Sequence, residues 1–133
     1  MEFPPHTRRR VVEAPTRRPP AELQSVRVIF EEDPDPDTSY LEQDEFEDRL
    51  AAYKRGEFHF VGVRAEAEVL IAETVQTLRS PGLYGIESDT DEEELDGLAA
   101  EQWTGLRVVL KTVGVPTDQL PLAPNREWIE WRT

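Results

Sequence analysis

The stretch "FHFVGVRAEAEVLIA", residues 58–72, alternates apolar and polar side chains over most of its length. Successive side chains of a β-strand point to opposite faces of the sheet. This period therefore predicts a strand whose odd-numbered side chains from Val61 to Ile71 face the interior. Arg64, Glu66 and Glu68 then line the opposite face, which we expect to lie mostly in water.

The segments on either side predict further strands. Residues 26–31 alternate in the same way, and "ETVQTL", residues 73–78, follows too closely for anything but an antiparallel partner. Pro81 and Gly82 are placed for a type II turn, in which proline restricts φ and glycine adopts a positive φ. This turn predicts another short strand over residues 83–86.

A first helix is predicted between the first two strands. Ser39 and Glu42 have the spacing of a capping box, in which each side chain accepts a hydrogen bond from a backbone amide at a helix start. Apolar residues at helical spacing follow up to Tyr53, and Gly56 can end the helix. His59 is expected to share the apolar face of the next strand.

A second, longer helix is predicted over residues 91–113, where apolar residues recur every three or four positions. Seven acidic residues between Glu87 and Asp96 crowd its start, where free amides and the helix dipole favour negative charge. Thr90 and Glu93 have capping-box spacing, and Gly114 is expected to end the helix in a left-handed conformation. The two internal glycines lower helix propensity, and one is expected to let the helix lie close to the sheet.

The order β-α-β-β-β-α predicts an α+β fold, a two-layer sandwich. An antiparallel sheet of about four strands is expected to carry both helices on one face. We expect a disordered Pro/Arg-rich arm over residues 1–25, an acidic domain over 26–115 and a Pro/Trp-containing tail over 116–133. Trp128 and Trp131 in the tail could anchor a partner, but packing of their rings back onto their own domain is favoured, and an added edge strand is one form that this packing could take.

Composition narrows the possible functions. The 133-residue chain has a formal charge of −13, which opposes direct nucleic-acid binding by the core and favours cationic partners. It has no cysteine, which excludes disulfides, thiolate zinc sites and a cysteine nucleophile. No apolar run is long enough to span a bilayer and no secretory signal is evident, so a cytoplasmic protein is expected.

Two stretches of the chain, "HFVGVRAEAEVLI" and "GLYGIESDTDEEEL", resemble a group of small acidic proteins of unknown function that is associated with bacterial genomes and their mobile elements. The resemblance covers approximately residues 38–114 and omits both ends of the chain. It implies accessory or regulatory work rather than core metabolism. It implies no activity, cofactor or catalytic residue for positions of this chain.

Three chemistries compete for the acidic residues. Asp89, Asp91 and Glu93 offer oxygen ligands for a cation, but the stretch lacks the mid-loop glycine of a calcium loop, so no dedicated metal site or cofactor is expected. Glu66 and Glu68 could divide acid and base roles, although the chain has no recognisable catalytic motif. Acid clusters at residues 31–37, 42–48 and 87–96 could also imitate the phosphate spacing of a nucleic acid and occupy the basic groove of another protein.

We interpret the chain as a non-enzymatic protein-interaction or regulatory module, with an acidic nucleic-acid mimic as the main alternative and a carboxylate-based or metal-dependent enzyme as a further one. A protein partner is expected, a basic protein being the favoured class. The candidate interaction residues are Arg64, Glu66, Glu68, Asp89, Asp91, Glu92, Glu93, Trp128 and Trp131.

Overall fold

The computed structural model describes residues 21–133 and has an α+β architecture. Residues 1–20 of the expected disordered arm lie outside the described residues, whereas residues 22–25 belong to strand β1, so the predicted boundary of the arm at residue 25 is wrong. The strands are β1 (Glu22–Glu32), β2 (Phe60–Ile71), β3 (Thr74–Arg79), β4 (Leu83–Glu87) and β5 (Ile129–Arg132). The α-helices are α2 (Glu47–Lys54) and α3 (Glu92–Thr112), and short 3₁₀ turns are η1 (Ser39–Glu42), η2 (Asp44–Phe46), η3 (Thr117–Gln119) and η4 (Arg126–Trp128).

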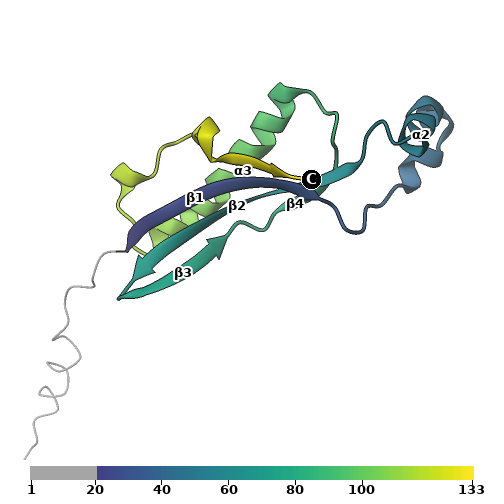
Figure 1. Cartoon of the computed structure of the whole chain (residues 1–133). Coiled ribbons are helices and arrows are strands. Elements are labelled where there is room, and N and C mark those ends of the chain that lie inside the picture. The colour runs from purple at the N-terminus through teal and green to yellow at the C-terminus, as the bar shows by residue number, and fades with distance from the viewer. Residues whose placement is uncertain (1–20) are drawn as a thin grey trace, which may run out of the picture.

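The five strands form one mixed sheet in the order β3-β2-β1-β5, and β4 pairs with the first part of β2 (Figure 1). β2 is antiparallel to β1, β3 and β4, whereas β5 is parallel to β1. The expectation of a four-stranded antiparallel sheet is therefore corrected. A parallel fifth strand became possible because the long crossover through β2, β3, β4 and α3 returns the chain to the free edge of β1.

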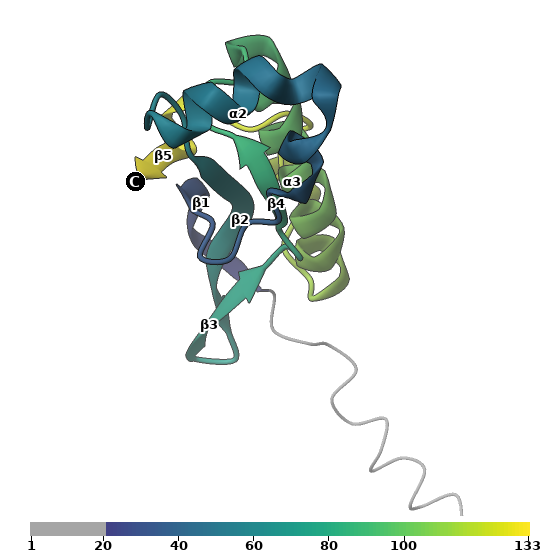
Figure 2. The same ribbon diagram turned by 90° about the vertical axis from the view of Figure 1, so that its right-hand side faces the viewer.

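Helix α3 covers one face of the sheet, as Figures 1 and 2 show. The odd-numbered side chains of β2 from Val61 to Val69 are fully buried on this face, which confirms the inward direction expected from the sequence. They pack against Trp103, Leu106 and Leu110 of α3. Trp103 is the largest fully buried side chain, yet the sequence pattern did not single it out.

Helix α2 does not share this face. It lies beyond the end of the sheet (Figure 1) and has a separate small core, so the expectation of two helices on one face is wrong. The reason is that α2 and the segments on either side of it are rich in aromatic residues. These residues pack against one another in a separate cluster and not against the buried face of β2. The members of this cluster are Tyr40, Leu41, Phe46, Leu50, Ala52, Tyr53, Phe58 and Phe60.

The first predicted helix also starts differently. Thr38, Ser39 and Gln43 make no side-chain cap bond to a helix amide there; Ser39 instead donates to Asp37. Two 3₁₀ turns precede an α-helix of only 8 residues. Gly56 follows with φ +77°, as expected of the glycine that ends a helix. His59 is exposed rather than packed on the apolar face, so the expectation for this residue is wrong.

The N-terminal cap of α3 differs from the predicted one, whereas its C-terminal end is as predicted. The cap is Asp91, whose carboxylate accepts from the amide of Glu94 at 2.9 Å, and not the expected Thr90, which donates to the carbonyl of Glu87. At the other end Gly114 has φ +104° and the amide of Val115 donates to the carbonyl of Leu110, as predicted.

The glycines inside α3 do not approach the sheet. A Cβ added at Gly97 or Gly105 would meet nothing within 4 Å, so the expected close packing against the sheet is wrong. The turn between β3 and β4 is held to α3 instead by Gln102, whose side-chain oxygen accepts from Ser80 Oγ at 2.6 Å and from the amide of Gly82 at 2.9 Å. Gly82 has φ +86°, as the predicted type II turn requires.

The C-terminal segment packs against the domain. Trp103 Nε1 donates to the carbonyl of Pro121 at 2.8 Å, and the ring of Trp128 meets that of Trp103 edge-on. Trp131 stacks on Phe30 of β1, with ring centroids 4.4 Å apart. The packing of this tail onto its own domain, favoured from the sequence, is thus confirmed, and its last residues add an edge strand to the sheet. No helix in the described part of the chain is long and apolar enough to cross a membrane.

Candidate interaction surfaces

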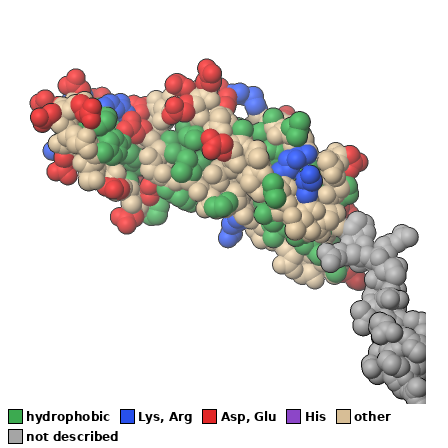
Figure 3. Space-filling view, turned by 180° about the vertical axis from the view of Figure 1, so that it is seen from behind, with side chains coloured by type: hydrophobic (Ala, Val, Ile, Leu, Met, Phe, Trp, Pro, Cys, Tyr) green, Lys and Arg blue, Asp and Glu red, His purple; other side chains and the backbone are tan. Residues whose placement is uncertain are grey.

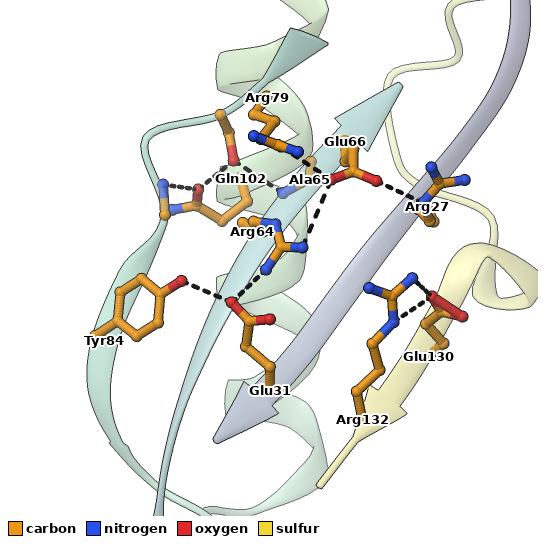
Figure 4. Close-up of polar contacts among 12 residues, drawn as sticks. Arg27, Glu31, Arg64, Ala65, Glu66, Arg79, Tyr84, Gln102, Glu130 and Arg132 are labelled. Atoms are coloured by element: carbon orange, nitrogen blue, oxygen red, sulfur yellow. Dashed lines mark hydrogen bonds and ion pairs between the residues drawn. The ribbon is translucent and has the colours of Figure 1, made fainter. Parts of the chain in front are cut away.

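The face of the sheet opposite α3 carries a network of ion pairs centred on Glu66 of β2 (Figure 4). One carboxylate oxygen of Glu66 accepts from Arg27 Nε of β1 at 2.7 Å, and the other accepts from Arg79 Nε of β3 at 3.0 Å. Arg64 Nη2 lies 3.5 Å from the same carboxylate. Three strands therefore each supply one arginine to a single glutamate.

These arginines cover Glu66, which is only 5% exposed. The expectation that the carboxylates of this face lie mostly in water is wrong for Glu66. Burial acts to raise the pKa of Glu66, but the hydrogen bonds from Arg79 and Arg27 and the nearby positive charges outweigh it and hold that pKa below its usual value. Glu66 is thus an ionised, fully paired carboxylate rather than a proton donor held ready at neutral pH.

The second carboxylate of the expected pair is placed differently. Glu68 accepts from Ser25 Oγ at 2.9 Å and lies 4.0 Å from Arg27, with 41% of its side chain exposed. Glu68 and Glu66 are two residues apart on the same strand face and share Arg27. The two carboxylates therefore belong to one surface network that Arg27 connects.

At the β4 end of this face, Arg64 donates to Glu31, and Tyr84 donates to the same carboxylate at 2.8 Å. These contacts lower the pKa of Glu31, chiefly through the hydrogen bond from Arg64. The ring of Tyr84 lies over Gly62, because a Cβ added there would be only 2.0 Å from Tyr84 Cδ1. Gly62 is therefore required for the tyrosine to cover this part of β2.

The candidate acids at the start of α3 do not form a single site. Asp89 accepts from Arg49 at 2.8 and 2.9 Å, Asp91 caps the helix, and Glu92 accepts from Arg126. Glu93 is exposed on the first turn. Within residues 21–133 no group of three or more His, Cys, Asp or Glu side chains is arranged to hold a metal ion.

An excess of acidic charge lies at the end of the molecule that carries α2. We define the acidic lobe as residues 33–57, which contain nine acidic and three basic side chains. Eight of these acids are exposed, and Figure 3 shows acidic side chains gathered over this end, at the left of the view. The exposed acids are Asp35, Asp37, Glu42, Asp44, Glu45, Glu47, Asp48 and Glu57.

A cluster of contacts around Glu87 and Asp89 helps to fix the acidic lobe to the rest of the domain. Arg49 of α2 donates to Glu87 at 2.7 Å and to Asp89, and its guanidinium lies 3.9 Å from the centre of the Phe58 ring. Tyr40 donates to Glu87, and burial together with this carboxylate raises the pKa of Tyr40. One of the three cations of the lobe is therefore used for attachment, and Arg55 is paired with Glu57.

The two candidate tryptophans have different surroundings. Trp128 is partly buried against the main core, whereas Trp131 is 45% exposed at the edge strand β5. Comparison with protein-family models, with curated proteins and with solved structures finds no match to this chain. The resemblance to small acidic proteins of bacterial genomes therefore stays a prediction.

Proposed function

We propose that this protein is a non-enzymatic interaction module that binds a basic protein through the acidic lobe, and that it works in the cytoplasm. The observation that carries the proposal is the contrast between two charged surfaces. On the open sheet face, four arginines stand beside four glutamates, namely Arg27, Arg64, Arg79 and Arg132 with Glu31, Glu66, Glu68 and Glu130. In the acidic lobe, acids outnumber bases by nine to three.

An exposed excess of carboxylates attracts a cationic surface over several ångströms and speeds its association. Charges that are already paired on the same chain contribute much less to such attraction. Six exposed acids of the lobe lie on the turns and the helix between residues 42 and 57, which also carry a buried aromatic cluster. The lobe is therefore a folded surface that presents its acids in defined positions.

An enzymatic role for Glu66 and Glu68 receives no support from their contacts. A general acid or base needs a free position for the group with which it exchanges a proton. Both oxygens of Glu66 already accept from arginines, and Glu68 accepts from Ser25. These contacts favour the interaction role.

The test is affinity capture from a cell lysate by the full-length chain, at about 50 mM and about 500 mM salt. The Debye length falls from roughly 14 Å to roughly 4 Å between these conditions, so a lobe-dependent partner is expected to be lost at the higher salt. The variant Glu45→Gln/Glu47→Gln/Asp48→Asn removes three exposed lobe charges and is expected to lose the same partner. A partner that this variant keeps would contradict the proposal.

A matched control removes the same charge elsewhere. Glu22→Gln/Glu101→Gln/Glu127→Gln also neutralises three exposed acids, all outside the lobe, and is expected to retain the partner. Equal loss in both triple variants would mean that net charge alone, rather than the lobe, attracts the partner.

Nucleic-acid mimicry is a narrower form of the same proposal, favoured by the gathering of unpaired acids at one end of the molecule. In that case the captured basic protein binds DNA or RNA. Added duplex DNA or RNA should then release it in proportion to concentration, because the lobe and the nucleic acid would occupy the same groove.

A further inference from the structure

A groove runs between the first half of α3 and the C-terminal strand β5. One hollow of about 250 Å³ is lined by Leu95 of α3, Phe30 of β1, and Ile129 and Trp131 of β5. A second hollow of about 190 Å³ follows it along α3, beside Ala100, Ala123 and Pro124. Asp96, Arg126 and Ile129 line both hollows, which are therefore neighbours along one groove.

The strand beside the groove has a free edge. β5 is the last strand in the order β3-β2-β1-β5, so no other strand of residues 21–133 pairs with its outer side. An extended peptide can add to such an edge through main-chain hydrogen bonds, while its alternate side chains enter neighbouring pockets. Trp131 lies half-exposed at this edge, held by its stack on Phe30.

The groove also contains two exposed ion pairs made by Arg126. Arg126 reaches from the C-terminal segment across to α3, where it donates to Glu92 and, at 3.1 Å, to Asp96. Its side chain is 68% exposed, and that of Glu92 is 77% exposed. Because exposed ion pairs contribute little to stability, another cation can replace Arg126 at these two carboxylates at small cost.

We infer that this groove binds an extended, arginine-containing segment of a partner protein, which adds to the edge of β5 and places its arginine at Glu92 and Asp96 in place of Arg126. The carboxylates of Glu92 and Asp96 select a cation. The apolar side chains that line the rest of the two hollows can contact an aliphatic side chain on each side of it. Side chains on one face of an extended peptide are about 7 Å apart, so the two aliphatic side chains that flank the arginine are about 14 Å from each other. The inference rests on the proposed function only in that the partner is a protein with a basic segment.

The test uses the full chain and a synthetic fluorescent peptide, acetyl-Thr-Val-Thr-Arg-Thr-Val-Thr, followed by fluorescence anisotropy. A peptide with glutamate in place of arginine is the control. The arginine peptide is expected to bind and the glutamate peptide to bind at least about tenfold more weakly, because it would place a third carboxylate beside Glu92 and Asp96. Equal binding of the two peptides would overturn the inference.

The decisive variant is Arg126→Ala, because it removes the competing cation. It is expected to tighten binding of the arginine peptide by about threefold to fivefold, the equivalent of one exposed ion pair. Weaker binding by Arg126→Ala would overturn the inference, since it would give Arg126 a direct role in holding the peptide. Arg55→Ala, which removes an equally charged and exposed side chain in the acidic lobe, is expected to leave binding unchanged.

Two further variants report on the groove itself. Glu92→Gln/Asp96→Asn is expected to abolish the preference for arginine over glutamate, and Trp131→Ala to weaken binding by about tenfold or more. All of the substituted side chains except Asp96 are exposed, and thermal unfolding of each variant checks that it folds. A Trp131→Ala variant that folds and binds normally would overturn the inference.

The same assay separates this inference from the lobe proposal. Glu45→Gln/Glu47→Gln/Asp48→Asn should leave peptide binding unchanged, because the lobe lies outside the groove. If the peptide does not bind but capture of the partner still depends on the acidic lobe, the groove inference is overturned and the lobe proposal stands. A peptide with the sequence "TRRRVVE" of residues 7–13 is compared with the arginine peptide. If it binds more tightly, the occupant of the groove is the N-terminal segment of this chain and not a separate partner, and the inference is overturned.

Discussion

The two faces of β2 are stabilised by different forces, although they belong to the same twelve residues. The face toward α3 is apolar and dry, with Val61, Val63 and Val69 fully buried. The open face is held by ion pairs around Glu66, whose arginine partners stay partly in contact with water. Burial on the first face comes from contact with a helix, and burial on the second comes from the side chains of the sheet itself. The two faces should therefore respond differently to truncation, charge removal and pH.

The largest effect is expected from the covered face. Trp103→Ala removes the largest buried side chain together with its hydrogen bond to the carbonyl of Pro121. The free energy of unfolding should fall by about 3–5 kcal/mol, as for other buried aromatic truncations. Urea denaturation followed by circular dichroism measures it. A loss below about 1 kcal/mol would mean that the core of α3 does not depend on this ring.

A smaller effect is expected from the centre of the open face. Glu66→Gln keeps the size of the side chain but leaves Arg27 and Arg79 facing each other without a charge between them. We expect a loss of about 1–3 kcal/mol of unfolding free energy. Glu68→Gln, at a half-exposed position on the same face, is the matched control and should cost less than about 0.5 kcal/mol. Equal losses would contradict the central role assigned to Glu66.

A third effect is expected at Gly62, where the ring of Tyr84 lies over the glycine. Gly62→Ala places a Cβ in the space of the Tyr84 ring, so the ring must move away from the open face. We expect a loss of about 1–2 kcal/mol, measured by the same denaturation. In the background of Tyr84→Ala the same substitution should cost much less, because the clash is gone. Additive losses in the double variant would show that the ring and the glycine are independent.

The smallest effect is expected from pH. The pKa values of Glu66 and Glu31 are lowered in the folded protein, so these groups contribute stability above their unfolded pKa values. That contribution is lost as the pH falls through the lower folded values. The unfolding free energy should therefore decrease on acidification below about pH 4.5. The pH dependence of Glu66→Gln, measured by denaturation at several pH values, should be shallower than that of the original chain.

Local sequence patterns predicted the parts of the fold that depend on near neighbours. The inward set of β2 follows from a period of two, and the turn at Gly82 and the end of α3 at Gly114 follow from positive φ angles that glycine accepts. The cap of α3 was misplaced by one residue because Thr90 and Asp91 are both good capping residues, and only the contacts of Thr90 with Glu87 separate them.

The candidate sites were less predictable because their partners are distant in the sequence. Arg64, Glu66 and Glu68 share a face, as the alternation indicated, but the burial of Glu66 depends on Arg27 of β1 and Arg79 of β3. Trp103 was missed because a tryptophan between Gln102 and Thr104 has no pattern that marks it as central. The groove beside Trp131 depends on the parallel pairing of β5 with β1, which joins residues about 100 positions apart.

The sequence by itself determined the α+β class, the two faces of β2, the course of α3 and the acidic character of the protein, because these follow from side-chain periodicity and composition. Only the tertiary structure decided that α2 stands apart on its own aromatic core, that three arginines enclose Glu66 and that the C-terminal segment pairs in parallel with β1. Such outcomes depend on which surfaces meet, since burial and ion pairing act between residues that the chain brings together only when it folds.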